Sequence, residues 1–237
     1  MATAPGPAPA VVLAYGHEGG GSGVPWCGPE YRCAPAGREL AAAVDEALHL
    51  RDGPVCVVPM TLGRDPGLIG ESARAARWAA GRGPEGRVAL SEPFGTADHL
   101  IGWLRAAAVL AATHDGHRQA LLITAPVASP FDDAELFRIA HLVCRYGGHR
   151  WVEVAFAGGE PDIDEGIRRC RTLGAERIIL IPAGFAPAGP DEVLADPHTE
   201  DGGPLLTPAA IRAVAAARVA AAMARLARAD NGIASGL

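Results

Sequence analysis

The sequence predicts an α/β fold of two similar lobes, each a doubly wound parallel sheet flanked by helices. Short apolar runs alternate with alanine-rich amphipathic segments along the chain. Apolar strands that are each followed by a helix are typical of parallel sheets with right-handed crossovers. The order also repeats, because residues 11–14 resemble 120–123 and residues 57–60 resemble 180–183. A length of 237 residues accommodates two small lobes.

The first lobe is expected over residues 11–115, after a Pro/Ala-rich leader at residues 1–10 that should be poorly ordered. Its strands are expected at residues 11–15, 55–60 and 88–91, and its helices at 37–50, 66–80 and 97–112. Asp65 before Pro66 favours an N-cap followed by proline in the first helical turn. Residues 24–35, rich in proline and glycine, are interpreted as an ordered loop.

The second lobe is expected over residues 116–229, followed by a tail at 230–237. Its strands are expected at residues 120–124, 152–156 and 177–181, and its helices at 132–146, 162–173 and 208–229. A long Pro/Gly/Asp loop is expected after the sixth strand. Because ligands of open parallel sheets lie beyond the carboxyl ends of the strands, we expect the loops after the strands to converge on one cleft.

The composition argues against several classes of partner. The net charge of −6 and the isoelectric point near 5.7 disfavour nucleic acid and anionic membranes. The sequence has no apolar stretch of the roughly 18 to 20 residues that a membrane span needs, and its start lacks the basic residues of a signal peptide. We therefore expect a soluble, cytoplasmic protein. All 21 basic residues are arginine, so an anionic small substrate stays open, although a GC-rich coding bias explains the arginines equally well.

His17 is the first candidate site residue. It lies in the turn Gly16-His17-Glu18-Gly19, which directly follows the first expected strand. The glycines allow a sharp turn and the close approach of a ligand. An imidazole at such a strand exit can bind a metal ion or carry a proton, and the alternative is a turn histidine bonded to backbone. The run matches neither common phosphate-loop pattern, so a nucleotide loop is not expected.

The five cysteines do not resemble a disulfide framework for a chain of this size. Cys27 and Cys33 lie in the loop after His17, so these three residues could form a soft metal site. The spacing is not that of a recognised zinc site, and loop packing or incidental thiols are the alternative. We expect the other cysteines to be small buried residues: Cys56, Cys144 and Cys170.

Two carboxylates and a second histidine complete the candidates. Glu92 and Glu160 each precede a proline at a strand exit, where a carboxylate could accept protons near a bound metal ion or could only cap and bond the loop. His198 lies in the long loop after the sixth strand, among acidic residues. It could extend over the cleft.

Several of these segments resemble the small sirohydrochlorin chelatases of the CbiX type, within the class II chelatase superfamily. The matching segments in the first half are residues 11–17 (VVLAYGH), 57–60 (VVPM) and 89–95 (ALSEPFG), and those in the second half are residues 152–161 (VEVAFAGGEP) and 174–182 (GAERIILIP). The resemblance covers most of residues 11–225. It implies two α/β lobes that hold a tetrapyrrole while a divalent cobalt, iron or nickel ion is inserted, with the metal ion as a substrate and no organic cofactor.

The resemblance also implies roles for particular residues. His17 matches the first family histidine, whereas the second is missing, with Arg64 in the corresponding loop. His198 or a loop cysteine could substitute for it, or one histidine could suffice. Histidines of the family hold the metal while an acidic group, here Glu92 or Glu160, removes the pyrrole protons. Because the substrate carries many carboxylates, three arginines are expected to bind it: Arg32, Arg38 and Arg64.

Other functions stay open at this point. A degenerate chelatase or metallochaperone would bind the metal or the tetrapyrrole without catalysis, as the missing histidine would allow. A sugar- or nucleotide-binding module on the same scaffold is disfavoured because the sequence has no phosphate loop. The oligomeric state, including a homo-oligomer, is also open.

Overall fold

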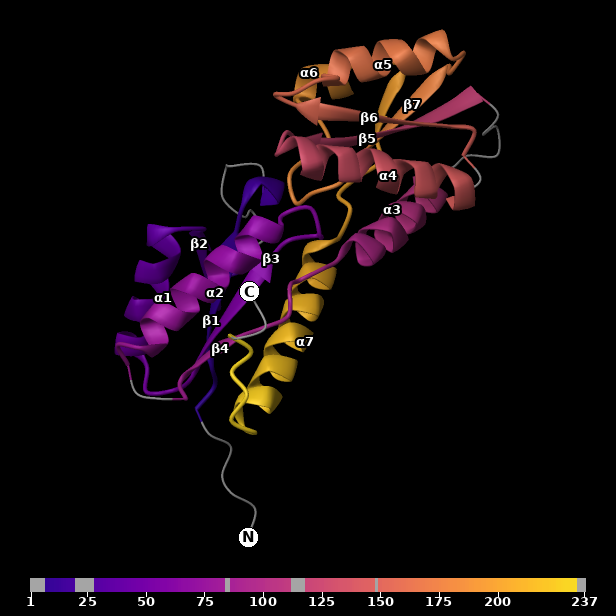
Figure 1. Cartoon of the computed structure of the whole chain (residues 1–237). Helices are drawn as coiled ribbons and strands as arrows, with labels where there is room; N and C mark the ends of the chain where they lie inside the picture. The colour runs from indigo at the N-terminus through magenta and orange to yellow at the C-terminus, as the bar shows by residue number, and fades with distance from the viewer. Residues whose placement is uncertain (1–6, 20–27, 84–85, 112–117, 148, 234–237) are drawn as a thin grey trace.

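The computed structural model describes residues 7–19, 28–83, 86–111, 118–147 and 149–233. Over these residues the chain forms two four-stranded sheets, one from each half of the sequence, with all strand pairs parallel. The strand orders are β2-β1-β3-β4 and β6-β5-β7-β8. The predicted fold of two similar α/β lobes is therefore confirmed (Figure 1).

The elements have the following bounds. The first sheet contains β1 (Ala10–Tyr15), β2 (Tyr31–Pro35), β3 (Val55–Met60) and β4 (Val88–Leu90). The second sheet contains β5 (Gln119–Pro126), β6 (Trp151–Ala157), β7 (Arg177–Pro182) and β8 (Thr199–Asp201). The helices are η1 (His17–Gly19), a 3-10 turn, and α1 (Arg38–Leu50), α2 (Pro66–Ala80), α3 (Ala97–Ala111), α4 (Pro130–Gly147), α5 (Ile163–Thr172), α6 (Asp191–Leu194) and α7 (Pro208–Leu226).

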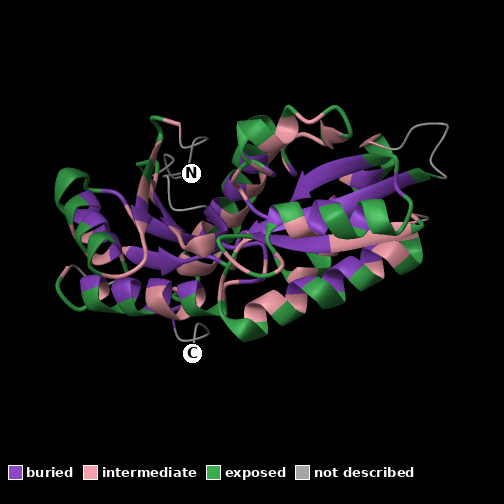
Figure 2. Ribbon diagram, turned by 90° about the horizontal axis from the view of Figure 1, so that it is seen from above, coloured by how far each residue is buried: buried purple, intermediate pink, exposed green. Residues whose placement is uncertain are grey.

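Local sequence explains most of these elements. Every residue of β3 is buried, as expected for a central strand covered on both faces. The Asp65 carboxylate accepts a hydrogen bond from Leu68 N at the start of α2, and Thr207 caps α7 in the same way. Figure 2 shows the result: the strands are mostly buried, and the helices expose only their outer faces. Within the described residues, no helix has the length and apolarity that crossing a membrane requires.

Two strands differ from the sequence prediction. β2 lies in the segment interpreted as an ordered loop, and β8 lies in the long loop after the sixth strand. Both are short edge strands with few fully buried residues, so neither carries the continuous apolar run that marks the central strands.

The sheet registers define how the two lobes correspond. Ala14 of β1 pairs with Pro59 of β3, and Thr124 of β5 pairs with Pro182 of β7. When these pairs are superposed, His17 and Val127 occupy equivalent positions. Each lies three residues after the first member of its pair. The architecture therefore repeats, but the imidazole of the first lobe corresponds to an apolar side chain in the second.

Each half of the sequence contributes a helix to the other lobe. α3, from the first half, packs against α4 and β7, whereas α7, from the second half, packs against β3 and β4. Arg218 of α7 donates hydrogen bonds to Phe94 O in the first lobe. Figure 1 shows α7 beside the first sheet and α3 beside α4. The expected lobe boundary at 115/116 lies outside the described residues, and it stays a prediction.

The exchanged helices belong to an apolar cluster that spans both lobes, beside a further cluster within each lobe. A single cluster of buried side chains includes Val58 of β3, Leu104 of α3 and Ile123 of β5. The C-terminal tail also packs against the first lobe, because Leu90 N donates to Asn231 O and Ile233 is buried. Neither sheet therefore has a complete hydrophobic core without residues from the other half.

We expect both lobes to unfold in one transition, and Leu104→Ala tests this. Leu104 is fully buried, so its truncation should lower the free energy of unfolding by about 2–5 kcal/mol. Denaturant unfolding, with hydrogen exchange of β3 and β5 amides, would measure the loss in each sheet. Leu110→Ala, on an exposed position of the same helix, should change stability by only about 0.5 kcal/mol. Separate transitions for the two sheets would contradict the prediction.

Candidate functional site

The candidate site lies where the carboxyl ends of the strands of both lobes meet. The η1 turn directly follows β1 and brings His17 against the second lobe. A pocket of about 490 Å³ opens there, lined by His17 and by residues at the ends of β5, β6 and β7. Much of its remaining wall is the loop after β7, residues 183–190, which we call the strap. We call this cavity the interlobe pocket.

The His17 ring is held by a carboxylate. Its Nδ1 lies 3.2 Å from Asp65 Oδ2, while Asp65 Oδ1 accepts from Leu68 N at the start of α2 at 3.0 Å. A Cβ at residue 16 would overlap the Asp65 carboxylate, so Gly16 is needed for this approach. With the Nδ1 proton directed at Asp65, the Nε2 lone pair stays free, and Nε2 is buried without a hydrogen-bond partner among the described residues. Metal-binding histidines are commonly oriented in this way.

The electrostatics of this pair favour a charged carboxylate. Burial alone lowers the pKa of His17, but the hydrogen bond and negative charge of Asp65, with the charge of Glu18, raise the pKa above its ordinary value of 6.5. Burial raises the pKa of Asp65, but the hydrogen bond and charge of His17 outweigh it, so the pKa lies below its usual value. Protonated His17 cannot bind a metal ion, so protons compete with the ion and binding weakens as the pH falls through this raised pKa.

Glu18 belongs to the site but was not singled out from the sequence. Its side chain is fully buried, and its Oε2 accepts hydrogen bonds from Thr61 Oγ1 and, at 2.9 Å, from Leu62 N. Burial raises its pKa more than these hydrogen bonds and the charge of Arg64 lower it. Its backbone oxygen accepts a bond of 2.9 Å from Phe185 N in the strap. A glutamate in a glycine-rich turn gives no sequence signal of burial.

Arg64 does not have the substrate-binding position that we expected. Its side chain is fully buried, and its Nη2 lies 3.2 Å from Asp133 Oδ1 at the start of α4. Its Nε donates at 3.5 Å to Asp132 O. The expectation that Arg64 pairs with a substrate carboxylate is therefore wrong for this structure, because the guanidinium already pairs with acidic residues of the protein between the lobes.

The other two expected arginines lie outside the interlobe pocket. Arg32, the second residue of β2, is exposed and forms an ion pair with Glu46 of α1. Arg38 is exposed at the first residue of α1. Among the described residues, no arginine lines this pocket. Their role as carboxylate-binding residues stays a prediction.

The two Glu-Pro turns occupy different environments. Glu92 follows β4 and forms an ion pair of 2.8 Å with Arg225 of α7. Glu160 is exposed after β6, in a turn whose flanking residues Ala157 and Ile163 line the interlobe pocket. β4 and β6 lie at opposite, non-equivalent edges of their sheets. Glu160 therefore borders the pocket, whereas Glu92 is held against α7.

The structure does not bring His198 to His17. The backbone oxygen of His198 accepts from Ile178 N at the amino end of β7, whereas the interlobe pocket lies at the carboxyl end of that strand. The expectation that His198 extends over the cleft is therefore wrong. The cause is β8, which pairs the following residues, Thr199–Asp201, along β7.

The cysteines also differ from expectation. Cys33 is disulfide-bonded, so the expectation that the cysteines form no disulfide is wrong for this residue, and Cys33 is not a thiolate ligand. Cys27 lies outside the described residues. Burial raises the pKa of Cys56 and Cys170 to about 12, in agreement with their expected role as buried apolar residues, whereas Cys144 is only partly buried, against expectation. Over the part of the chain that is described, no group of three or more His, Cys, Asp or Glu side chains is placed to hold a metal ion.

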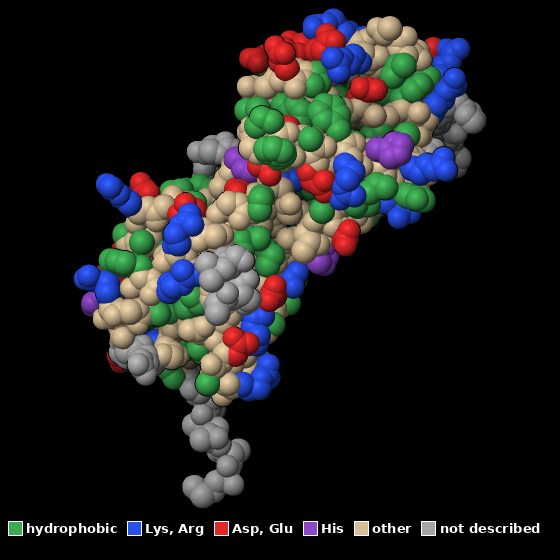
Figure 3. Space-filling view, viewed as in Figure 1, with side chains coloured by type: hydrophobic (Ala, Val, Ile, Leu, Met, Phe, Trp, Pro, Cys, Tyr) green, Lys and Arg blue, Asp and Glu red, His purple; other side chains and the backbone are tan. Residues whose placement is uncertain are grey.

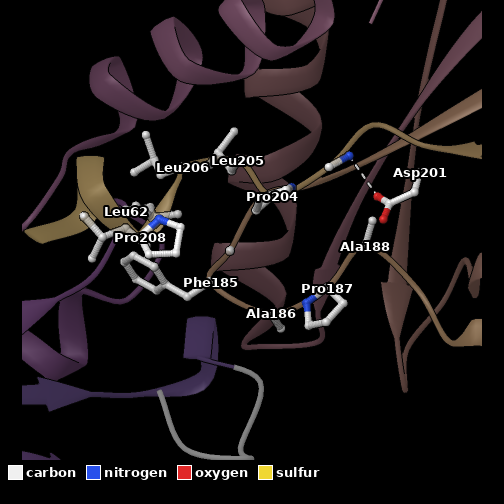
Figure 4. Close-up of a pocket in the computed structure, with 13 residues that line it drawn as sticks. Leu62, Phe185, Ala186, Pro187, Ala188, Asp201, Pro204, Leu205, Leu206 and Pro208 are labelled. Carbon is white, nitrogen blue, oxygen red and sulfur yellow. Dashed lines mark hydrogen bonds between the residues drawn. The ribbon is translucent and has the colours of Figure 1, made fainter. Parts of the chain in front are cut away.

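A second cavity lies across the strap. This apolar pocket of about 310 Å³ shares Gly184, Ala186, Pro187 and Ala188 with the interlobe pocket. Its other walls include Leu62 and the segment before α7, and Asp201 lies at one end, where Oδ1 accepts from Gly203 N at 2.8 Å (Figure 4). The strap is therefore a thin partition between two cavities.

The outer rim of the second lobe is apolar. Figure 3 shows hydrophobic side chains gathered over the start of α4 and the carboxyl end of β6, beside the junction of the lobes. Val127 is 41% exposed and Phe131 is 86% exposed in this region. The strap gives the interlobe pocket an apolar wall beside a single imidazole. Such a site can hold a metal ion through one protein ligand and leave most coordination positions open.

Comparison with known proteins agrees with this architecture. Residues 129–189 match the CbiX family model. A sirohydrochlorin cobaltochelatase from Priestia megaterium is 34% identical over 56 residues, which cover 23% of this chain and 18% of that protein. The matched segment thus spans less than a fifth of the relative's length.

Two solved structures share the fold over 90% of this chain. They are SirB from Bacillus subtilis with Fe3+, with a TM-score of 0.58, 15% identity and 95% of its chain covered, and CbiX, the terminal enzyme for biosynthesis of siroheme in denitrifying bacteria, with a TM-score of 0.56, 18% identity and 99% covered. The family match confirms the resemblance to the CbiX family over residues 129–189, and the two solved structures confirm the fold.

The His17–Asp65 pair predicts an unusual titration. The His17 ring should titrate with a pKa above 6.5, and in Asp65→Asn the pKa should fall below that value, because burial then dominates. NMR of the imidazole protons would measure both values. His149 is an internal control, because burial alone lowers its pKa and it is distant from Asp65 in the sequence. An unchanged His17 titration in Asp65→Asn would show that the carboxylate does not control the ring.

Proposed function

We propose that this protein inserts a divalent metal ion into a sirohydrochlorin-like tetrapyrrole. The observation that carries the proposal is His17, whose unpartnered Nε2 and carboxylate-held ring line a pocket between two lobes. The similarity to CbiX-type chelatases supplies the class of substrate. Cobalt, iron and nickel are the candidate ions, and the pocket residues do not discriminate among them.

His17 would bind the metal ion through Nε2, and Asp65 would orient the ring. An ion that is handed to a macrocycle must keep open coordination positions, because the incoming pyrrole nitrogens replace its other ligands. One imidazole with water meets this requirement better than a closed four-ligand cage. The Asp65 charge also makes the imidazole a stronger ligand when His17 is neutral.

Insertion releases two pyrrole N–H protons, which need an acceptor. We assign this role to Glu160, an exposed carboxylate in the turn beside the interlobe pocket. Glu92 is the weaker candidate, because its carboxylate is paired with Arg225. Glu160 would pass each proton to solvent, and the metal ion would take the place of both protons among the four nitrogens.

A non-catalytic carrier of metal or tetrapyrrole is the second candidate. It is favoured by the single imidazole and by a pocket wall that carries no arginine among the described residues. Mixing the protein with sirohydrochlorin and each metal ion separates the two functions. Faster insertion than in the protein-free reaction, followed by absorbance, supports the chelatase, whereas tight binding without acceleration supports the carrier.

Replacing His17 tests the metal-binding role. His17→Ala should reduce insertion to the protein-free rate, because the variant has no pocket ligand for the ion. The free energy of unfolding should fall by about 1–3 kcal/mol, since the largely buried Asp65 carboxylate loses its partner. His49→Ala, on an exposed position of α1, should keep the original rate. Full turnover in His17→Ala would refute the role.

The two Glu-Pro turns provide a matched pair of variants for the proton acceptor. Glu160→Gln should lower kcat by about 100-fold without changing metal affinity, as expected for loss of a general base. Glu92→Gln should leave kcat within about twofold, because this carboxylate pairs with Arg225. Steady-state kinetics at saturating metal would measure both. If Glu92→Gln gave the larger loss, the assignment would be reversed.

A further inference from the structure

We propose that the Arg64–Asp133 ion pair is a positioning contact that sets the separation of the two lobes around the interlobe pocket. Arg64 follows β3 in the first lobe, and Asp133 lies in the first turn of α4 in the second. The pair therefore connects the element that carries Asp65 with the element that forms the rim of the second lobe. Its effect on tetrapyrrole binding rests on the proposed function, whereas its effect on the lobes does not.

Burial strengthens the Arg64–Asp133 ion pair, so the pair favours one arrangement of the two lobes. The Arg64 side chain is fully buried and that of Asp133 is 18% exposed, with 3.2 Å between Nη2 and Oδ1. Arg64 Nε also donates to Asp132 O at 3.5 Å. A buried guanidinium that loses its partner keeps its full desolvation cost, because it stays protonated. Separation of the lobes would remove the Asp133 carboxylate from this guanidinium, so the closed arrangement is favoured.

Glu18 forms a second connection beside the first. Its carboxylate accepts from Leu62 N, which ties the η1 turn to the loop that carries Arg64. Its backbone oxygen accepts from Phe185 N in the strap, across the junction of the lobes. A Cβ at residue 184 would lie 2.9 Å from Glu18 O, so Gly184 allows this approach. The first-lobe loops are thus bonded to the second lobe at α4 and at the strap.

The Arg64–Asp133 ion pair is connected to His17 through Asp65. Asp65 is the next residue after Arg64, and its Oδ2 lies 3.2 Å from His17 Nδ1. His17 and Asp65 both belong to the first lobe, whereas the opposing pocket wall belongs to the second. The Arg64–Asp133 pair therefore acts on the distance between the imidazole and that wall, and it leaves the His17–Asp65 geometry unchanged.

Asp133→Asn is the variant that tests the charge of the ion pair most directly. Asp133 Oδ1 also accepts from Ala128 N at 3.1 Å, and an asparagine oxygen retains this acceptor and the shape while removing the charge. Arg64→Gln removes the other charge and serves as the second variant. Arg171→Ala is the matched control, because Arg171 and Asp196 form an exposed ion pair of 2.8 Å within the second lobe.

Hydrogen exchange of the Phe185 amide measures the contact between the lobes, and this measurement does not depend on enzymatic activity. We expect exchange of this amide to be about tenfold faster in Asp133→Asn and Arg64→Gln, with amides inside β3 and β5 unchanged. Arg171→Ala should leave the Phe185 amide unaffected. Unchanged exchange in both variants, or faster exchange throughout both sheets, would overturn the proposal.

Ligand binding gives the second readout. In Asp133→Asn the KM for sirohydrochlorin should rise about fivefold or more, while the Kd for Co²⁺ alone stays within about twofold, because only the macrocycle needs both lobes. A parallel loss of Co²⁺ affinity, or an unchanged KM, would overturn the positioning role. If the unaltered protein has no insertion activity, the proposed function fails, and the Phe185 exchange still decides the role of the ion pair.

Discussion

The buried charges between the lobes are the constraint on which the site depends. Glu18, Arg64 and Asp133 lie close together at the junction, where each would be costly without the others. The Arg64–Asp133 ion pair, with the hydrogen bonds that Glu18 accepts from Leu62 N and Phe185 N, determines where the exits of β1 and β3 lie relative to α4. Because His17 and Asp65 belong to those same exits, the position of the imidazole follows from how these charges are satisfied. The polar interior of this junction thus organises a site whose walls are largely apolar.

The two lobes repeat a scaffold but not its chemistry. When the paired positions Ala14–Pro59 and Thr124–Pro182 are superposed, Val127 of the second lobe is equivalent to His17 of the first. The first lobe therefore presents an imidazole, and the second presents an apolar strap and rim. Under the proposed function, this asymmetry suits a tetrapyrrole with a flat apolar face and a central metal site, since each lobe would meet a different part of it.

Much of the fold could be predicted from the sequence, but less of the site could. The six predicted strands and their helices carry apolar runs and caps, whereas β2 and β8 are edge strands without such runs. The strand exit at His17 was recognisable from its glycines. The burial of Glu18 and Arg64 was not, because pairing between charges distant in sequence depends on the tertiary arrangement. For the same reason, the apolar face of α7 indicates that the helix is covered, but not which sheet covers it.

The exchange of α3 and α7 has a consequence for how far each half of the chain can fold alone. Each half of the chain completes the layers of the other, so a half produced alone would leave one face of its sheet bare and one helix without a sheet. Two identical halves could satisfy each other only as a dimer with swapped helices. A half produced alone would thus have to pair with a second copy to bury these surfaces. The pocket, which lies between the lobes, would form only in that pair.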